Sequence, residues 1–168
     1  MILTHDDIIH EIENGHLKID PLNRAAIGPA SVDLTVSNSF RIFKRIDHNI
    51  PVQEHTDYTT ITKKRIVTSK YTIKPQELIL GITEENVTLP TNIAGWLNSR
   101  SRFARLGLAV HITAPFIQPG ESGKQVLEIY NAGPNNLDLY PGEKLCQIIF
   151  QYCKGKAMYQ GQYQNQEL

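Results

Sequence analysis

Arginine and serine side chains gather in one short segment of this sequence. Asn98–Arg105 reads Asn-Ser-Arg-Ser-Arg-Phe-Ala-Arg. Guanidinium groups bind phosphate oxygens through forked, charge-assisted hydrogen bonds, and serine hydroxyls can fill the remaining acceptor sites. The segment therefore predicts a phosphate-binding element, with a solvated basic turn as the alternative, because short charge clusters are common on protein surfaces.

A single carboxylate interrupts an apolar run later in the chain. Glu128 lies in Val-Leu-Glu-Ile-Tyr, residues 126–130, a pattern typical of a buried strand. A buried carboxylate is costly unless it is paired, and it tends either to have a partner or to carry a raised pKa. Glu128 is therefore a candidate general acid and base, and the competing interpretation is a side chain on the solvent face of a half-exposed strand.

Two other polar groups lie next to apolar runs. His111 opens His-Ile-Thr-Ala-Pro at the end of a run that indicates a strand, where a packed or capping histidine is the more common outcome. Asp33 follows the turn at Gly28-Pro29, and it could serve a site or cap that turn.

The elements that must position these residues are mostly short strands. Thr4, Asp7 and the apolar stripe after them predict one helix over residues 5–14. Beyond it, apolar runs alternate with Pro, Gly and Asn, which favours a sandwich or barrel. We expect a loop or mobile hairpin over 44–64, a short helix or loop over 100–105, and strands over 31–36, 40–43, 66–69, 78–82, 108–112, 125–130, 137–139 and 145–152.

Composition narrows the class of protein. The 168 residues carry 17 basic and 17 acidic side chains, a balance that predicts no general attraction to nucleic acid. No apolar stretch approaches the length of a membrane span, and the two cysteines indicate reduced thiols in a cytoplasmic protein. The signature of zinc-dependent deaminases and the phosphate-binding P-loop are both missing from the sequence. We expect a single domain over 1–168 with a flexible C-terminal arm from about 155 to 168.

Several segments, in order, resemble the dCTP deaminases of the dCTP deaminase and dUTPase superfamily. The resemblance runs almost end to end and is weakest over 44–75. It rests on Met1–Asp7 with Ile19–Pro21, Pro29–Leu34, Gly95–Leu108, His111–Ala114, Ile117–Gly123, Val126–Asn131, and Tyr159 with Tyr163 and Gln166.

The resemblance implies a mainly β fold, a distorted β-barrel, assembled as a homotrimer whose sites take residues from two chains. It implies hydrolytic deamination of dCTP to dUTP and ammonia without zinc. Mg²⁺ would accompany the substrate triphosphate rather than occupy a cage of protein ligands. The partner is then a small deoxynucleoside triphosphate, with no nucleic acid and no membrane.

The same resemblance assigns roles to individual residues. Glu128 would shuttle the proton, Ser101 would hold the water and the base, and Arg105 would stabilise developing charge. The residues implied in substrate binding are Arg100, Arg102, Phe103, Ala104, Thr113, Ala114, Gln118, Val126, Leu127, Tyr159, Gln162 and Gln166.

The sequence departs from the family pattern at positions that bear on activity. Gln118 stands where the family usually has Asp, and an amide cannot activate the water that cleaves dUTP. Pro115 replaces the Gly that is usual in bifunctional members. Gln162 replaces a phosphate-binding Lys, a loss that Arg102 would offset. We therefore favour a dCTP deaminase. The alternatives are a dUTPase, a bifunctional dCTP deaminase and dUTPase, and a nucleotide-binding relative without catalysis.

Overall fold

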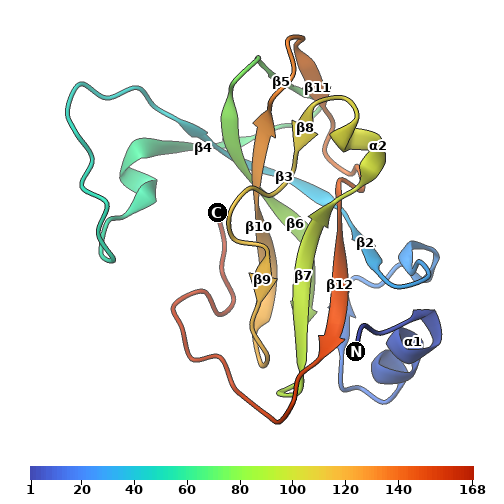
Figure 1. The fold of residues 1–168 in the computed structure, drawn as a ribbon. Coiled ribbons are helices and arrows are strands. Elements are labelled where there is room, and N and C mark those ends of the chain that lie inside the picture. Colours follow the sequence, from blue (N-terminus) through green and yellow to red (C-terminus); the bar gives the residue numbers. More distant parts are fainter.

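The computed structural model describes residues 1–168, and its elements are mainly strands (Figure 1). The helices are α1 (His5–Glu13) and α2 (Ser101–Ala104), with short 3-10 turns at Arg24–Ala26 and Tyr58–Ile61. The strands are β1 (Lys18–Asp20), β2 (Val32–Leu34), β3 (Val36–Phe43), β4 (Thr62–Ile66), β5 (Tyr71–Ile73), β6 (Leu78–Thr88), β7 (Ile93–Ser99), β8 (Leu108–Ala109), β9 (Phe116–Ile117), β10 (Ser122–Asn131), β11 (Leu137–Leu139) and β12 (Cys146–Tyr152).

The strands form three sheets. One has the order β4-β3-β6-β10-β8, with β1 also paired to β6; a second has the order β2-β12-β7-β9; and β11 pairs with β5. The prediction of a mainly β fold with a short N-terminal helix is confirmed. The strands do not close into one continuous barrel, since no ladder joins the larger sheets.

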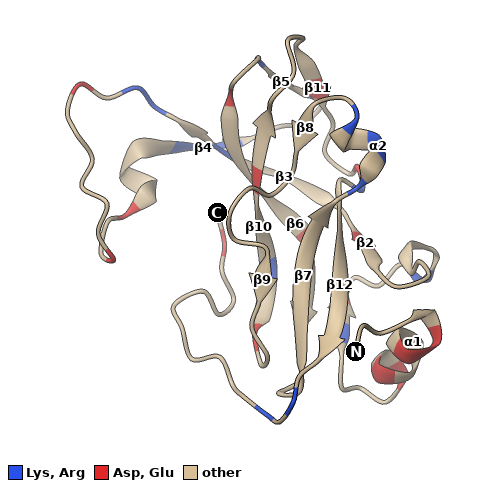
Figure 2. Ribbon diagram, in the orientation of Figure 1, with Lys and Arg blue, Asp and Glu red and all other residues tan.

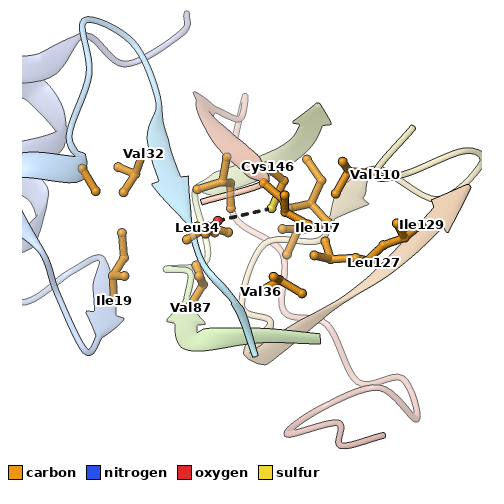
Figure 3. Close-up of a cluster of buried hydrophobic side chains, with 14 of the residues drawn as sticks. Ile19, Val32, Leu34, Val36, Val87, Val110, Ile117, Leu127, Ile129 and Cys146 are labelled. Atoms are coloured by element: carbon orange, nitrogen blue, oxygen red, sulfur yellow. Dashed lines mark hydrogen bonds between the residues drawn. The ribbon is translucent and has the colours of Figure 1, made fainter. Parts of the chain in front are cut away.

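A single apolar cluster of 27 buried residues packs between the sheets. Figure 3 shows Leu34 and Val36, Ile117, Leu127 and Ile129 converging from different strands. The side chains of Leu127 and Ile129 lie on one face of β10, and both are fully buried. Because successive strand residues point to opposite sides, burial of these two side chains directs Glu128 away from the core.

Helix α1 begins as the sequence predicts. The Asp7 carboxylate accepts hydrogen bonds from the Thr4 backbone amide at 2.9 Å and from the Thr4 hydroxyl at 2.7 Å. These bonds satisfy the Thr4 backbone amide at the start of the helix, where the negative charge of Asp7 also interacts favourably with the helix dipole. Ile8 is fully buried, so the helix covers one end of the core through its apolar stripe.

Three strands were not expected from the sequence, namely β5, β7 and β9. Strand β7 was missed because Gly95 and Asn98 are residue types that are common in loops. A Cβ atom on Gly95 would lie 2.9 Å from Ile148 Cδ1, so the glycine leaves room for the Ile148 side chain of the neighbouring strand β12. The glycine therefore marks a crowded position within a strand here rather than a turn.

Several expected elements have different bounds from the prediction. Strand β6 continues to Thr88 through Glu84 and Glu85, because the Glu85 carboxylate is satisfied by the Thr35 amide at 2.9 Å. The strand expected over 108–112 stops at Ala109.

The strand expected over 66–69 was misplaced, since β4 spans 62–66 and begins inside the range expected to be a loop or mobile hairpin. Strand β4 pairs antiparallel with β3, so the two strands form a hairpin. Residues 44–61 connect them and extend from the sheets at the left of Figure 1.

The turn after α2 depends on a glycine. Gly107 has φ +86°, and a Cβ atom there would lie 2.9 Å from both N and Cα of Gly133. We expect Gly107→Ala to lower the free energy of unfolding by about 1–3 kcal/mol more than Gly142→Ala, because main-chain atoms cannot move aside as a side chain can. Gly142 is the matched control, with φ +88° and nothing within 4 Å. Urea denaturation measures both, and equal losses would contradict the close approach.

Candidate functional site

Glu128 lies at the centre of the candidate site. Its Oε2 atom accepts hydrogen bonds from the backbone amides of Ile112 at 2.7 Å and Thr113 at 2.6 Å. Its Oε1 atom accepts one from the Thr113 hydroxyl at 2.9 Å. These amides bond to a carboxylate instead of a neighbouring strand, which explains why β8 ends at Ala109.

The hydrogen bonds decide the protonation state of Glu128. Burial raises the pKa of this carboxyl, but the bonds from Thr113, Ile112 and Ala114 together outweigh burial and hold the pKa below its ordinary value. Of the two outcomes expected for a carboxylate in this strand, pairing is therefore the one observed. An ionised Glu128 at neutral pH can accept a proton from water.

Glu128 lines a pocket of about 470 Å³. Six of the residues that the sequence assigned to the site line it: Ala114, Gln118, Val126, Glu128, Tyr159 and Gln166. The other lining residues are Tyr58, Leu80, Leu97, His111, Phe116, Ile117, Glu121, Gln125 and Tyr163. A mixed apolar and polar hollow of this size is typical of a small-ligand site.

His111 contributes to this pocket with one ring nitrogen unused. Its Nδ1 atom is buried and has no hydrogen-bond partner. The expectation of a packed or capping histidine accounts for its partial burial but not for its place in the pocket wall. A ligand that donates to or accepts from Nδ1 would satisfy the ring.

The C-terminal arm covers one side of the pocket. Residues 155–168 form no helix or strand, yet they are attached to the turn that precedes β10 and to its first residues. The Tyr159 amide donates to the Pro119 carbonyl at 2.9 Å, and the Asn165 amide donates to the Ser122 carbonyl at 2.7 Å. Gln166 Nε2 donates to the Lys124 carbonyl at 3.0 Å.

Gly123 permits this attachment. It has φ +150°, and a Cβ atom there would lie 3.1 Å from N and Cα of Asn165. The backbone of the arm therefore rests directly on the backbone of the turn. Tyr159, Tyr163 and Gln166 consequently face the pocket from the same arm.

The basic segment lies elsewhere in the chain. Ser101, Arg102 and Arg105 are exposed on or next to α2, and their side chains form no hydrogen bond. None of the residues from Arg100 to Arg105 lines the pocket around Glu128. Figure 2 shows the basic residues of α2 at the upper right, whereas the C-terminal arm lies at the lower left.

Arg100 already has partners within the chain. Its Nη2 atom lies 2.9 Å from Asp33 Oδ2, and its Nη1 atom donates to the Lys144 carbonyl at 2.7 Å. Asp33 therefore neither caps the preceding turn nor lines the pocket, and the interpretation of a turn cap was wrong. The pair fixes the start of α2 against β2.

The remaining assigned residues occupy varied positions. Phe103 is half-buried and lines a second, separate pocket of about 350 Å³, next to Ala104 on α2. The Leu127 side chain is fully buried in the core, so only its backbone could contact a ligand. Gln162 lies beside the loop residues 53–56 rather than in the pocket around Glu128. Thr113 is exposed and bonded to Glu128.

The electrostatics of the pocket are unusual for a site expected to bind a triphosphate. Its lining contains two carboxyl groups, Glu121 and Glu128, and no Lys or Arg. The structure contains no group of three or more His, Cys, Asp or Glu side chains that could hold a metal ion. No helix is both long and apolar enough to cross a membrane.

Sequence reasoning missed Glu121, Gln125 and Tyr58 as pocket residues, whereas Tyr163 belongs to the arm that the family resemblance identified. Glu121 lies between Gly120 and Gly123, and this glycine spacing is a signal for a tight turn that could have drawn attention to it. Nothing in the sequence placed Tyr58, because it reaches the pocket from the loop over 44–61.

Known proteins resemble this chain along most of its length. The family model described as dCTP deaminase-like matches residues 2–153. A protein named dCTP deaminase from Alteromonas mediterranea is 40% identical over 169 residues, covering 94% of this chain and 85% of its own. One named dCTP deaminase, dUMP-forming, from Parafrankia sp. is 37% identical over 175 residues, covering 99% and 87%.

Solved structures support the same fold. The crystal structure of 2'-deoxycytidine 5'-triphosphate deaminase from Agrobacterium tumefaciens superposes with a TM-score of 0.71 at 20% identity and covers 89% of this chain. This chain spans about half, 47%, of the length of that one. A mutant dUTPase from the Staphylococcus aureus phage phi11, whose structure is described with a structural Mg(II) ion, gives a TM-score of 0.52 at 16% identity over 87% of this chain.

Proposed function

We propose that this chain, which belongs to the dCTP deaminase-like family, converts dCTP and water to dUTP and ammonia. The observation that carries the proposal is Glu128, an ionised carboxylate held by three hydrogen bonds at the wall of a ligand-sized pocket. A carboxylate in this state can take a proton from water and later return it, which is the proton transfer that deamination requires.

The reaction would proceed through addition and elimination. Water adds to C4 of cytosine while Glu128 accepts a proton from it and passes that proton to N3. Glu128 then takes the proton of the new C4 hydroxyl and delivers it to the amino group, the bond from C4 to nitrogen breaks, and ammonia leaves. The C4 carbonyl and the N3–H of uracil remain. Val126 and Ala114 line the pocket beside Glu128, where they would contact the base.

The triphosphate needs cations that the pocket does not provide. We assign this role to Arg102, with Ser101 and Arg105 completing the catalytic site. Because these residues lie outside the pocket of their own chain, a site at an interface between subunits of a homotrimer would bring them to Glu128 of a neighbour. Mg²⁺ would enter as part of the substrate, bound by phosphate oxygens.

Arg100 and Gln162 have weaker support as substrate ligands. Arg100 is already paired with Asp33, and Gln162 lies beside the loop at 53–56. Arg100 would have to share its guanidinium between Asp33 and a phosphate, and Gln162 would have to reach the triphosphate from outside the pocket. We further treat residues 1–168 as one domain built on one core, acting in the cytoplasm, where its two unpaired cysteines would stay reduced.

Analysis of the products tests the proposal. Incubated with Mg²⁺ and dCTP, the purified protein should give dUTP and ammonia, and it should leave added dUTP intact. Gln118 supports this outcome because an amide cannot activate the water that attacks phosphate. Chromatographic separation of the nucleotides measures both reactions. Formation of dUMP would instead favour the bifunctional or dUTPase alternative, and binding without turnover would favour a non-catalytic relative.

A variant at position 118 provides the matching comparison. Gln118→Asp restores a carboxylate at the exposed edge of the same pocket. If the missing base is what limits dUTP cleavage, this variant should release dUMP where the unmodified chain does not. An unchanged product pattern would mean that Pro115 or Gln162 also limits that reaction.

A further inference from the structure

The turn that follows α2 exposes a leucine that the core of the chain does not use. Leu106 follows Arg105 directly and is 61% exposed. Its backbone amide donates to the Phe103 carbonyl at 2.9 Å, so the turn is held in place while the side chain stays outside the core. Leu106 lines the hollow of about 350 Å³ beside α2 together with Phe103 and the exposed Tyr140. These three residues form an apolar surface next to the cations of α2, which we call the α2 patch.

A second apolar surface borders the pocket around Glu128. Trp96 on β7 and Phe116 on β9 are paired across the two strands, and their ring centroids lie 4.7 Å apart. Each of the two residues is 40% exposed, because the next residues, Leu97 and Ile117, point into the core instead. Phe116 also lines the pocket. The two rings, which we call the ring pair, therefore form an apolar edge beside the candidate site.

The ring pair has the properties of a binding surface. The indole nitrogen of Trp96 donates to Gln151 Oε1 at 3.2 Å, so its polar atom has a partner within the chain. Large aromatic side chains with a satisfied polar atom are enriched at protein interfaces. Exposed apolar side chains that contact one another also indicate a binding surface more strongly than single exposed ones.

The charges beside the two surfaces are complementary. The ring pair adjoins a pocket whose wall contains two carboxyl groups and no Lys or Arg, whereas Leu106 adjoins the exposed Arg105 and lies near Arg102. Strand β9 and helix α2 lie apart in Figure 1, so the two surfaces do not meet within one chain. Complementary charges fix how two surfaces dock. The α2 patch therefore fits the ring pair of a second copy of this chain.

The covalent chain leads to the same pairing. If Arg105 of one subunit reaches Glu128 of the partner subunit, Leu106 follows within about 3.8 Å, the distance between consecutive Cα atoms. The exposed leucine then lies at the border of that pocket, where Phe116 offers an exposed apolar surface. Burial of Leu106 against the ring pair would remove apolar surface from water on both sides of the contact.

We propose that the α2 patch of one chain packs on the ring pair of a second copy, and that this contact places Arg102 and Arg105 at Glu128 of the partner subunit. The proposal rests on the proposed function, because it starts from a site shared between subunits. The contact is head-to-tail, since each chain uses a different surface toward each neighbour. Contacts of this kind close into a ring, such as a trimer, when the rotation between subunits permits it.

Opposite charges introduced on the two surfaces test the contact. Leu106→Lys and Trp96→Glu each place an unpaired charge in the interface, and neither position lines the pocket around Glu128. Each single variant should raise the protein concentration at which half of the chains are assembled by about 30-fold or more. The double variant pairs the two charges across every head-to-tail contact, and it should assemble about tenfold more tightly than either single variant. Sedimentation velocity over a dilution series measures the assembly of all four proteins.

Two exposed apolar residues of the other large sheet provide matched controls. Ile66→Lys changes a residue of β4 that is 56% exposed, and Phe43→Glu changes one of β3 that is 38% exposed. Both variants should assemble like the unmodified chain. Recovery in the double variant separates a broken contact from a failure to fold, because a second surface charge cannot restore an unfolded chain.

Assembly of either single variant like that of the unmodified chain would overturn the proposed contact. So would loss of assembly in both single variants without recovery in the double variant, or an unmodified chain that stays monomeric at the highest concentration. Deamination of dCTP is measured separately. An inactive chain whose assembly follows the expected pattern would keep the interface and disprove only the reaction, whereas an active chain without that pattern disproves this inference alone.

Discussion

Glu128→Gln is expected to lower kcat for dCTP deamination by about 10³-fold while changing the dissociation constant of dCTP by less than about threefold. Glutamine keeps the shape of the side chain: its oxygen can accept from the backbone amides of Ile112 and Thr113 while its NH2 group donates to the Thr113 hydroxyl oxygen, so the loop over 111–114 should hold its position. It cannot accept a proton from water, and the first transfer of the reaction is lost. Steady-state release of ammonia and calorimetric binding of dCTP measure the two quantities.

The control for this variant is Glu84→Gln, an exposed carboxylate on β6 that no part of the reaction uses. It should leave both kcat and binding unchanged. Turnover by Glu128→Gln within about threefold of the unmodified chain would disprove the role of Glu128. A parallel loss of binding and folding would instead show that the carboxylate mainly holds the loop at Ile112 and Thr113 in place.

The sequence predicts the strand that carries Glu128 because the local pattern and the tertiary structure agree. Leu127 and Ile129 are the apolar half of an alternating pattern, and both are fully buried. The residue between them must then face away from the core. The local pattern could not show what it faces, because Ile112 and Thr113 approach from a segment 15 or 16 residues away.

Strands are hardest to predict where a polar or small residue is stabilised by a contact with a residue distant in the sequence. Glu85 belongs in β6 because the Thr35 amide satisfies its carboxylate, and Gly95 belongs in β7 because Ile148 fills the space a side chain would occupy. Neither partner is near in sequence. Propensity alone therefore favours loops at both positions, and only long-range packing overrides it.

The pocket residues of the C-terminal arm, the turn before β10 and the loop over 44–61 could be predicted only in part. Tyr159 and Gln166 follow from the family pattern, but their attachment depends on Gly123 allowing the backbone of Asn165 to approach. Glu121 and Tyr58 reach the pocket through a turn and a long loop, whose paths depend on contacts that periodicity does not encode. A derivation from the sequence therefore identifies the strand residues of the site more readily than its loop residues.

The acidic pocket around Glu128 and the basic residues at α2 lie apart in the chain, and this separation bears on how the site is assembled. The pocket around Glu128 contains no cation, and the exposed cations at α2 line no pocket with Glu128. A dCTP molecule carries its reacting base and its phosphates on one small scaffold, so both sets of residues must meet. The proposed assembly of subunits would join them without unfolding either element.

Arg105→Ala is accordingly expected to lower kcat by about 10²–10³-fold, more than it weakens dCTP binding, because the guanidinium would act on charge that develops during the reaction. Mixing this variant with Glu128→Gln should then restore activity. In trimers that contain both variants, about one site in three would combine an intact Glu128 from one chain with an intact Arg105 from its neighbour. Co-expression with two different tags, tandem purification and ammonia release would measure the gain.

A second mixture distinguishes shared sites from nonspecific rescue. Ser101→Ala and Arg105→Ala both alter the segment at α2, which each chain would supply as one unit. No mixed site would then contain both intact residues, so this pair should stay at the level of the less impaired variant. Activity in the first mixture alone would support sites built from two chains. If neither mixture released ammonia although trimers were present, Arg105 would act in the same site as Glu128 of its own chain or take no part in the reaction.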